Sequence, residues 1–520
     1  MKNSHYVDIL GKKGGLTAPD SYDTAWVARV PRADDHTQPA WPQALVYLQE
    51  HQLADGGWGD PHVYYAHERT ISTLAAMLAL LEWGEPADGE RIEQAVAALH
   101  RYAPDLADEP HEPIGFELLL PRLADEVARF NLQLPRQAWA GVEQIAAQKS
   151  ALIGALRVEY DRPRTWWFNM EILPEEQLAA VDEAVLNEYG AIAISPSATA
   201  AYLRALRHSG QDSPQAAAFL DRVVSLSDGG AGVCYPIEGF EVMWTLDNYL
   251  RAGLSPGDPM LQPMLSWLRD YWVSSPSGMS HSRAFPVDDG DDTAVAFRVL
   301  RAAGLSISDR PLFRFWNDEE GHYYTYPDER TPSVSAAVHG LFAFRQANWD
   351  AQHECIAVEL TLWLREQMRK EGMLHDKWHV SPLYATSRVI EPLLGWDDQL
   401  ANDCIEFVLA HQRPDGGWGY TGRSTLEETA LAVLGLVAAR RGGQLADPAP
   451  LRRAACYLAQ HSLSRPVERL WIGKGLYRPV GVVNSLVHAA RLALQIERIR
   501  VRPVADGATK QRTSTVRWAS

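Results

Sequence analysis

One stretch of the chain decides the fold: HQLADGGWG at residues 51–59 returns as HQRPDGGWG at residues 411–419. Each copy leads, after a turn, into a run of apolar residues at helical spacing, 71–78 after the first copy and 429–434 after the second. In the first run, Ile71, Leu74 and Leu78 put one apolar face on a helix. Two related helical halves are the simplest explanation of this repeat.

The repeated stretch is interpreted as punctuation between helices. Glycine allows the positive φ that a tight turn needs, and we expect the Trp of each copy to pack between neighbouring helices. Helical spacing recurs in 214–226, 264–272 and 294–303 and along the face of Ile356, Leu360 and Leu364, whereas alternating strand-like patterns are scarce. The sequence therefore predicts an all-α fold.

The composition predicts a large, soluble protein. The chain has 520 residues, of which 46% are hydrophobic, so it can bury a large core, and its length suggests several domains. The 66 acidic residues outnumber the 49 basic ones, for a net charge of −17. This balance disfavours nucleic acid and anionic membrane surfaces, because both attract clustered Lys and Arg. No apolar run has the length of a membrane span or, near the N-terminus, of a signal peptide.

The cysteines indicate the redox compartment. They are scattered without a C-x-x-C pair, which speaks against a zinc cluster or a disulfide framework. A reducing cytoplasm fits this pattern best. The four positions are Cys234, Cys355, Cys404 and Cys456.

A second stretch, Asp288-Asp289-Gly290-Asp291-Asp292-Thr293, places four carboxyl groups ahead of a helical run at 294–297. A solvated acidic loop that caps a helix is the simplest interpretation, because Asp accepts hydrogen bonds from N-terminal NH groups. If the cluster is enclosed, however, like-charge repulsion and desolvation raise the proton affinity of at least one carboxyl group. A neutral acid could then persist near pH 7. On the residues alone, both interpretations remain open.

Two metal-binding patterns resemble this stretch in part. An EF-hand needs a Glu at the twelfth position, which counted from Asp289 is Leu300. Asp288, Asp289 and Asp292 satisfy the Asp-Asp-x-x-Asp magnesium pattern of ionisation-type terpene synthases, but no downstream partner motif follows.

The ordered motifs of the chain resemble those of class II diterpene cyclases, the copalyl diphosphate synthase-type enzymes. The resemblance runs from about Ser21 to Leu494 in family order, and its motifs are SYDTAW at 21–26, the two GWG turns, SPSATA at 195–200, DGDD at 289–292, DKW at 376–378 and LWIGK at 470–474. It implies two α-helical barrels of the squalene-hopene cyclase kind. Residues 36–254 would form an inserted barrel, while 1–35 joins 255–520 to complete the catalytic barrel. The compact length resembles that of bacterial two-domain members, and the polar stretch 502–520 is expected to fray.

The resemblance also implies an activity: protonation-initiated cyclisation of geranylgeranyl diphosphate to a bicyclic diterpenyl diphosphate, with the diphosphate retained. Asp291 matches the middle Asp of the family motif, the general acid, while Asp289 and Asp292 would orient its proton, carry countercharge and titrate with it as a coupled group. Such an acid must be held dry against the alkene. His339 lies where relatives place a polar partner for the acid, although a core histidine would give the same pattern. The position two residues earlier, where relatives often have Asn, is Ala337.

Further residues are assigned to the pocket and to the diphosphate. Lys474 and Lys377 match positions that bear on diphosphate binding in the family. Glu68 resembles its acidic magnesium-associated patch, which implies Mg²⁺ as a cofactor, although a solvated carboxylate at a helix start would look the same. Aromatic faces stabilise passing cations, and the candidates, each of which could instead pack in the core, are Trp167, Phe168, Tyr235, Trp244 and Trp378.

Two positions predict a rearranged product. Plant ent-copalyl synthases resemble one another in a His within Leu-His-Ser and an Asn within Pro-Asn-Val, which together position the water that removes the final proton. Aligned on Glu171 and on Tyr235-Pro236, this chain has Phe168 and Val233 instead. Neither side chain can hydrogen-bond a water. A longer-lived cation would undergo hydride and methyl shifts, towards a halimadane or clerodane (kolavenyl) skeleton.

Two other functions remain open at this stage. An ionisation-type synthase would bind magnesium through Asp288, Asp289 and Asp292 and release pyrophosphate. A non-catalytic α/α-toroid would bind proteins or lipids. For the cyclase, the expected partners are a prenyl diphosphate substrate and a downstream class I terpene synthase, with no nucleic acid and no integral membrane association.

Overall fold

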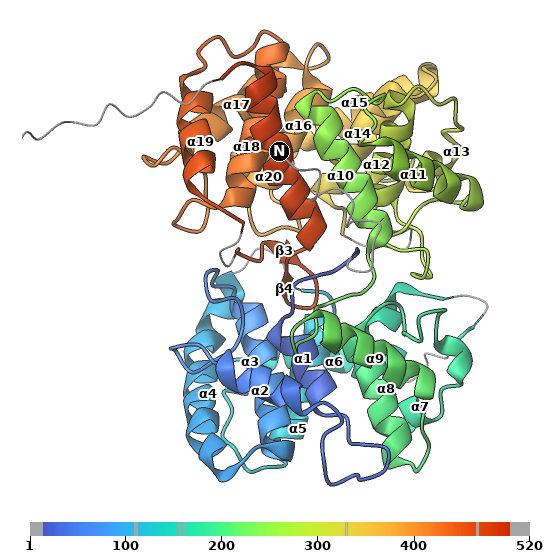
Figure 1. Ribbon diagram of the computed structural model, residues 1–520, viewed down its shortest axis with the longest axis vertical. Helices are drawn as coiled ribbons and strands as arrows, with labels where there is room; N and C mark the ends of the chain where they lie inside the picture. Colours follow the sequence, from blue (N-terminus) through green and yellow to red (C-terminus); the bar gives the residue numbers. More distant parts are fainter. Residues whose placement is uncertain are drawn as a thin grey trace, which may run out of the picture.

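The structure is a computed structural model that describes residues 14–108, 113–153, 158–160, 163–327, 329, 331–463 and 467–499. Figure 1 shows two stacked helical lobes that meet at a narrow waist. None of the helices in these ranges combines the length and the apolarity needed to cross a membrane. The predicted fraying tail, residues 502–520, lies outside the described residues.

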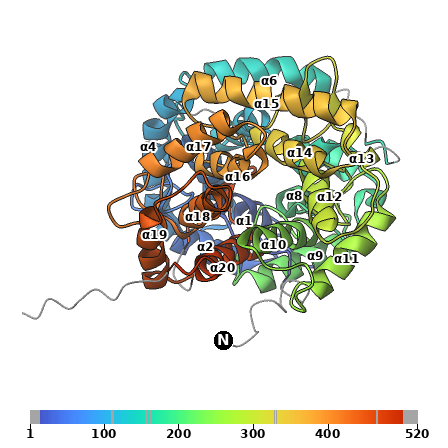
Figure 2. The same ribbon diagram turned by 90° about the horizontal axis from the view of Figure 1, so that it is seen from above.

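The upper lobe is an α/α barrel. Its inner ring closes because each helix contacts the next in the order α10, α12, α14, α16, α18, α20 and back to α10, and α11, α13, α15, α17 and α19 pack outside it (Figure 2). The elements are α10 Glu238–Ala252, α11 Gln262–Ser274, α12 Gly290–Ala302, α13 Arg310–Phe313, β1 Trp316–Asn317, β2 His322–Tyr323, α14 Val334–Gln346, α15 Ala351–Glu371, α16 Leu383–Leu393, α17 Asp398–Ala410, α18 Leu426–Arg441, α19 Ala449–Gln460, β3 Trp471–Ile472, β4 Leu476–Tyr477 and α20 Val480–Ile496.

The lower lobe is a second α/α barrel. Its inner ring closes through α1, α3, α5, the 3-10 segment η3, α8 and back to α1, while α2, α4, α6, α7 and α9 lie outside. The elements are α1 Ser21–Ala28, α2 Pro42–Glu50, α3 Ala66–Trp83, η1 Pro86–Asp88, α4 Gly89–Tyr102, η2 Ala103–Asp108, α5 Phe116–Ala128, α6 Ala140–Ile153, η3 Thr165–Ile172, α7 Glu175–Ala179, η4 Glu183–Val185, α8 Pro196–His208 and α9 Pro214–Leu226. The predicted all-α fold of two barrels is confirmed.

The division between the barrels differs from the prediction at two helices. Helix α1 was expected to complete the catalytic barrel, but it contacts α2, α3 and α8 and closes the lower ring. All eight of its residues are buried there. Conversely, α10 was assigned to the inserted barrel, yet it contacts α12 and α20 and closes the upper ring. The physical reason is ring closure, because each inner ring lacks one face until a helix distant in sequence supplies it.

The repeated stretches hold equivalent places in the two barrels. Trp58 lies before α3 and Trp418 before α18, and both are fully buried. Their indole NH groups donate to backbone carbonyls of the preceding helices, to Leu48 at 2.8 Å and to Val408 at 2.6 Å. Gly56 and Gly416 have φ values of +87° and +89°. The predicted role of these stretches as turns that pack a Trp between helices is confirmed.

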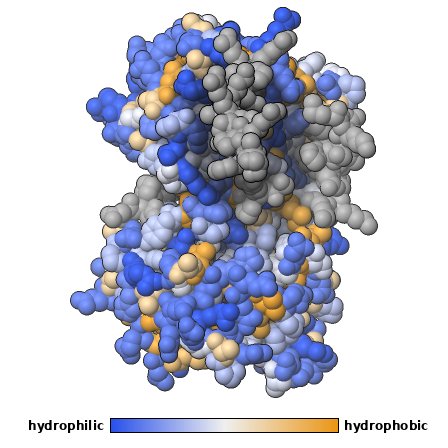
Figure 3. Space-filling view, turned by 60° about the vertical axis from the view of Figure 1, so that its left-hand side comes forward, coloured by the Kyte–Doolittle hydropathy of each residue, from blue (hydrophilic) through white to orange (hydrophobic). Residues whose placement is uncertain are grey.

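The hairpin β3–β4 joins the barrels at the waist. Its residues Leu470, Ile472 and Leu476 form an apolar cluster with Val63 and Tyr65 of the lower barrel. The strands pair antiparallel, with Trp471 opposite Tyr477. In Figure 3 most of the visible surface is hydrophilic, and hydrophobic residues appear at the waist and in scattered patches. The waist is therefore where apolar groups of both barrels converge.

Candidate active site

The Asp-rich stretch forms the start of α12. Asp289 is the N-cap residue, and its Oδ1 accepts the backbone NH of Asp292 at 2.7 Å. The loop before the helix folds back on it, since the Asp289 NH donates to the carbonyl of Met279 at 2.8 Å. Asp289 and Asp292 are 0% and 1% exposed. Both earlier interpretations hold in part, because the motif caps a helix and is also enclosed.

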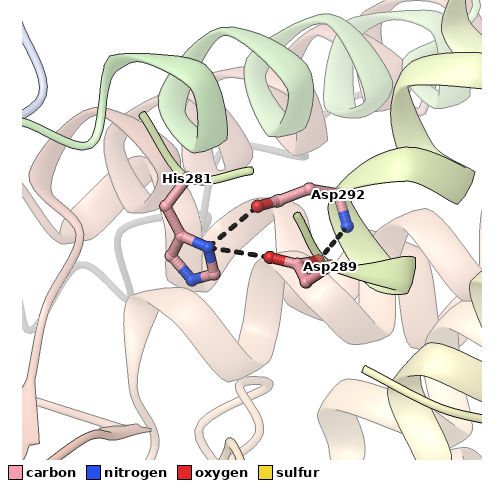
Figure 4. Close-up of side chains that lie close together, drawn as sticks. All are labelled: His281, Asp289 and Asp292. Atoms are coloured by element: carbon pink, nitrogen blue, oxygen red, sulfur yellow. Dashed lines mark hydrogen bonds and ion pairs between the residues drawn. The ribbon is translucent and has the colours of Figure 1, made fainter. Parts of the chain in front are cut away.

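His281 holds two of the carboxyl groups. Figure 4 shows its ring beside them with one nitrogen facing both, and Nδ1 lies 3.0 Å from Oδ2 of Asp289 and 2.8 Å from Oδ2 of Asp292. Burial, and next the charge of Asp292, raise the pKa of Asp289 to about 8. Burial alone would lower the pKa of His281, but the two carboxyl groups outweigh it and hold the pKa well above its ordinary value of 6.5. The ring stacks on Phe240 at 5.3 Å.

Asp291 faces a different set of partners. Its Oδ1 is hydrogen-bonded to Nδ1 of His339, and its Oδ2 accepts from Ser335 Oγ at 3.4 Å. Both partners lie in α14. From the family resemblance, Asp289 and Asp292 were predicted to orient the proton of Asp291. The structure corrects this, because those carboxyl groups are turned to His281 and orientation comes from α14.

The environment of His339 fixes which of its nitrogens carries a proton. Nε2 lies 3.5 Å from the guanidinium of Arg388. A guanidinium only donates hydrogen bonds, so Nε2 accepts and the proton of the neutral ring is on Nδ1. Burial lowers the pKa of His339 and outweighs the opposing charge of Asp291, which favours this neutral ring. Nδ1–H then donates to Oδ1 of Asp291, and Oδ2 is the oxygen that can carry the acidic proton.

A cavity of about 760 Å³ opens onto this motif between the two barrels. Asp289, Asp291 and Asp292 line its upper-barrel side, and Arg164 and Thr165 line a part that reaches solvent. The volume is in the range of about 300–1,000 Å³ usual for small-molecule sites. The aromatic residues in the wall are Phe168, Phe240, Phe285, Tyr326, Trp378, Trp471 and Tyr477.

The predicted pocket residues divide into three groups. Phe168, Val233 and Trp378 line the cavity. Trp244 lies behind the wall, where its NH donates to Tyr384 at 3.3 Å and its ring meets that of His339 edge-on. The remaining two belong to the core of the lower barrel and do not reach the cavity, a correction that follows from their packing; they are Tyr235, stacked on Phe219, and Trp167.

Lys474 is not in the cavity wall, contrary to the prediction of a diphosphate ligand. Its side chain is fully buried, and its ammonium group donates to Glu171 at 2.7 Å, to Ser195 at 2.7 Å and to Ser197 at 2.6 Å. The three protons of an ammonium group are thereby used. The nitrogen also lies 4.5 Å from the ring centre of Phe168. Lys474 thus ties the hairpin of the upper barrel to the wall of the lower one.

Lys377 lies beside the cavity. It forms an ion pair with Glu329, a wall residue, and its nitrogen lies 5.0 Å from the ring centre of Trp378. Burial lowers its pKa, against the opposing charge of Glu329. This lysine can reach an anion near the wall only by exchanging or sharing that partner.

Glu68 does not fit a magnesium ion. It is 1% exposed, and its Oε2 accepts the NH of Asp60 at 3.1 Å. Burial, and next the charge of Asp60, raise the pKa of Glu68 to about 8, so the carboxyl group favours its neutral form. The nearby cations are the side chains of Arg69 and Arg469. Mg²⁺ requires ionised oxygen ligands and usually keeps several waters, which this enclosed site does not offer.

The Asp-rich stretch does not form the magnesium site of an ionisation-type synthase. Asp288 accepts from Arg314 and from Ser277, each at 2.6 Å, and so turns away from the other carboxyl groups. Within the described ranges, three ligating side chains converge to within 4.8 Å at His281, Asp289 and Asp292. The imidazole between the two carboxyl groups already supplies their countercharge, which disfavours Mg²⁺ there as well.

Sequence reasoning missed several residues of the site. His281 precedes the motif in a loop without any pattern of its own, and Arg388 is on α16, far from Asp291 in sequence. Trp471 was also missed, although the LWIGK motif that contains it could have identified it; it lines the cavity. Its indole NH donates to Glu427 at 2.7 Å.

No family model matches the chain. The type B diterpene cyclase of Mycobacterium tuberculosis is 31% identical over 489 residues, which cover 92% of this chain and 96% of that protein. The (+)-kolavenyl diphosphate synthase of Herpetosiphon aurantiacus is 29% identical over 95% of this chain and 96% of its own length. The solved structure of ent-copalyl diphosphate synthase from Streptomyces platensis matches with a TM-score of 0.69 and 25% identity, over 92% of this chain and 96% of that one. With such identity over nearly the whole of both chains, this protein belongs to the class II diterpene cyclases.

Proposed function

We propose that the enzyme cyclises geranylgeranyl diphosphate to a bicyclic diterpenyl diphosphate of rearranged skeleton, with Asp291 as the acid and the diphosphate retained. The observation that carries this proposal is the environment of Asp291. Its carboxyl group lines an aromatic-walled cavity, and a neutral histidine and a serine hold it in place, whereas Asp289 and Asp292 are ion-paired with His281. Geometry of this kind suits proton donation to an alkene.

Protonation begins from Oδ2 of Asp291. His339 donates to the other oxygen and keeps the carboxyl plane fixed, and Ser335 hydrogen-bonds the carboxylate that remains. The cation then forms among aromatic faces, whose negative quadrupoles stabilise it while the walls exclude water.

The diphosphate is proposed to lie at the solvent end of the cavity. Arg164 lines that part of the wall, and Lys377 stands behind Glu329. The diphosphate keeps its bond to carbon, so it needs cations that hold it rather than a metal cluster that activates it. Mg²⁺, where it is required, is proposed to enter with the phosphate oxygens, which are its usual partners in nucleotide enzymes, and not through Glu68.

The rearranged skeleton is supported by two wall residues and by one relative. Phe168 and Val233 both line the cavity, and neither can hold a water by its side chain. The similar protein from Herpetosiphon aurantiacus is named for a kolavenyl product. A downstream class I terpene synthase would consume the diphosphate. All four cysteines are free thiols, consistent with the proposed cytoplasmic location.

The test is incubation with geranylgeranyl diphosphate, followed by mass spectrometry of the products with and without phosphatase. Cyclic products that appear only after phosphatase treatment, without released pyrophosphate, support the proposal. Pyrophosphate release together with a free hydrocarbon would refute it. Asp291→Asn is the matched control, since the amide has nearly the same shape but no acidic proton.

A further inference from the structure

The cavity wall contains few groups that could remove the last proton of the reaction. Within the described residues, the ionisable side chains that line it fall into two sets. One set lies at the start of α12 and around it: His281, Asp289, Asp291, Asp292 and Arg314. The other is spread over the rest of the wall: Arg164, Cys234, Tyr326, Glu329 and Tyr477.

The second set contains no available base. Arg164 is a permanent cation. Burial raises the pKa of the Cys234 thiol and of the Tyr326 and Tyr477 phenols, which therefore stay protonated. Glu329 is ion-paired with Lys377 and accepts the NH of Thr325 at 3.0 Å. Among the wall residues that the structure describes, those around Phe168 and Val233 therefore include no group that can deprotonate a decalin cation beside them.

The first set leaves Asp291 as the base. Arg314 is a cation held by Asp288. The ring of His281 is ion-paired with a carboxyl oxygen of Asp289 and one of Asp292, and the second oxygen of Asp289 caps the helix, so the charge of both groups is already balanced by the imidazole. Asp291 alone changes charge in the reaction, because it becomes a carboxylate when it gives its proton to the alkene. At that moment it is an ionised base that lines the cavity beside the first ring.

We infer that Asp291 acts twice: it gives the first proton to the substrate and takes the last proton back from the rearranged cation. This inference rests on the proposed rearranging cyclase. The O–H bond of Asp291 breaks and a C–H bond forms on the terminal alkene carbon. Hydride and methyl shifts then move the positive charge from the second ring back to the carbon next to that C–H bond. The C–H bond on the carbon first protonated then breaks, its electron pair forms the ring double bond with the cationic carbon, and the proton returns to the carboxylate of Asp291.

Electrostatics favours this return. The negative charge in the described wall is concentrated at the start of α12, whereas the charge of Glu329 is neutralised by Lys377. A cation that can migrate is therefore drawn towards the carboxyl groups. The inference selects a clerodane-type product whose double bond includes the carbon first protonated, over a halimadane formed by earlier proton loss.

The wild-type enzyme tests the inference in D₂O. The inference is that the proton returned to Asp291 is the one that it delivered, so the deuterium added at the start is the atom withdrawn at the end. The dephosphorylated product should then carry no deuterium. Conversely, substrate deuterated at the terminal alkene carbon, turned over in H₂O, should keep its label. The ent-copalyl diphosphate synthase from Streptomyces platensis, run in D₂O, is the control, since its unrearranged product must keep the added deuterium.

The outcomes separate the inference from the function proposed above. A rearranged product without deuterium supports both. A rearranged product that retains one deuterium overturns the inference, because the atom that Asp291 delivered was not the one withdrawn, and it leaves the proposed rearranging cyclase intact. An unrearranged copalyl product overturns both, because the last proton then leaves from the second ring.

Discussion

Lys474→Met tests whether this lysine ties the barrels together or binds the substrate. Methionine keeps much of the length of the side chain and removes its charge. In the structure the change leaves the carboxylate of Glu171 buried, at 0% exposure, with hydroxyl groups as its remaining partners. Removal of one partner from a buried ion pair costs about 3–5 kcal/mol, and at about 2–4 °C per kcal/mol for a barrel of this size Tm should fall by roughly 6–20 °C.

The assay is thermal unfolding together with substrate kinetics. Glu171→Gln in the Lys474→Met background removes the stranded charge, so the double variant should regain most of the lost Tm, and the two changes should be strongly non-additive. KM for geranylgeranyl diphosphate should change less than about tenfold, since the ammonium does not contact the cavity. An unchanged Tm with KM raised about ten- to a hundredfold, the loss expected for a charge-assisted hydrogen bond, would refute this reasoning and restore Lys474 as a diphosphate ligand.

Three further predictions concern the acid, the product and the pH dependence. Asp291→Asn should abolish cyclisation while Tm changes little. Asp288→Asn should keep most activity, because Asp288 is held by Arg314 outside the site. Loss of activity in Asp288→Asn with activity retained in Asp291→Asn would favour the ionisation mechanism. Phe168→His with Val233→Asn should shift product towards unrearranged or hydroxylated copalyl diphosphate, and neither single change should suffice because a lone polar group holds water poorly; an unaltered skeleton in an active double variant would contradict this. Burial raises the pKa of Glu68 to about 8, so its contribution to stability is present below the unfolded value near 4.5 and is lost as pH rises through about 8. Tm of Glu68→Gln should therefore fall less than that of the wild type between about pH 5 and about pH 9. Parallel plots of Tm against pH for the two proteins would show that Glu68 is ionised in the fold.

The fold was predictable because its signals are local. The residues of a Gly-Gly-Trp turn before a helix are enough to predict its conformation, and such turns occur at 56–59 and at 416–419, towards the two ends of the chain. The boundary between the barrels was not local. Whether α1 closes the lower ring or the upper one depends on its contact with α8, well over a hundred residues away, and no pattern within α1 records that choice.

The site divides in the same way. The three aspartates could be named from the sequence because their spacing is a motif, but their partners could not. His281 reaches Asp289 because the loop pairs Met279 with Asp289, and His339 reaches Asp291 because α12 and α14 pack together. For Lys474, the family motif predicted a diphosphate as its partner, which was wrong. Its partner Glu171 lies on the lower barrel, 303 positions away in the chain, and only the assembled interface brings them into contact.

The two barrels use one local construction, and counter-charge decides which of them holds an acid. Helices α8 and α14 both begin at a serine cap followed two residues later by a second serine, whose NH donates at 3.0 Å to an aspartate, Asp23 below and Asp376 above. The second serine then donates to a further carboxyl group, Glu171 at 3.2 Å or Asp291 at 3.4 Å. Below, that group is Glu171, and a lysine ammonium forms an ion pair with it. Above, the corresponding partner of Asp291 is the neutral imidazole of His339, which brings no positive charge to the carboxyl group that faces the cavity.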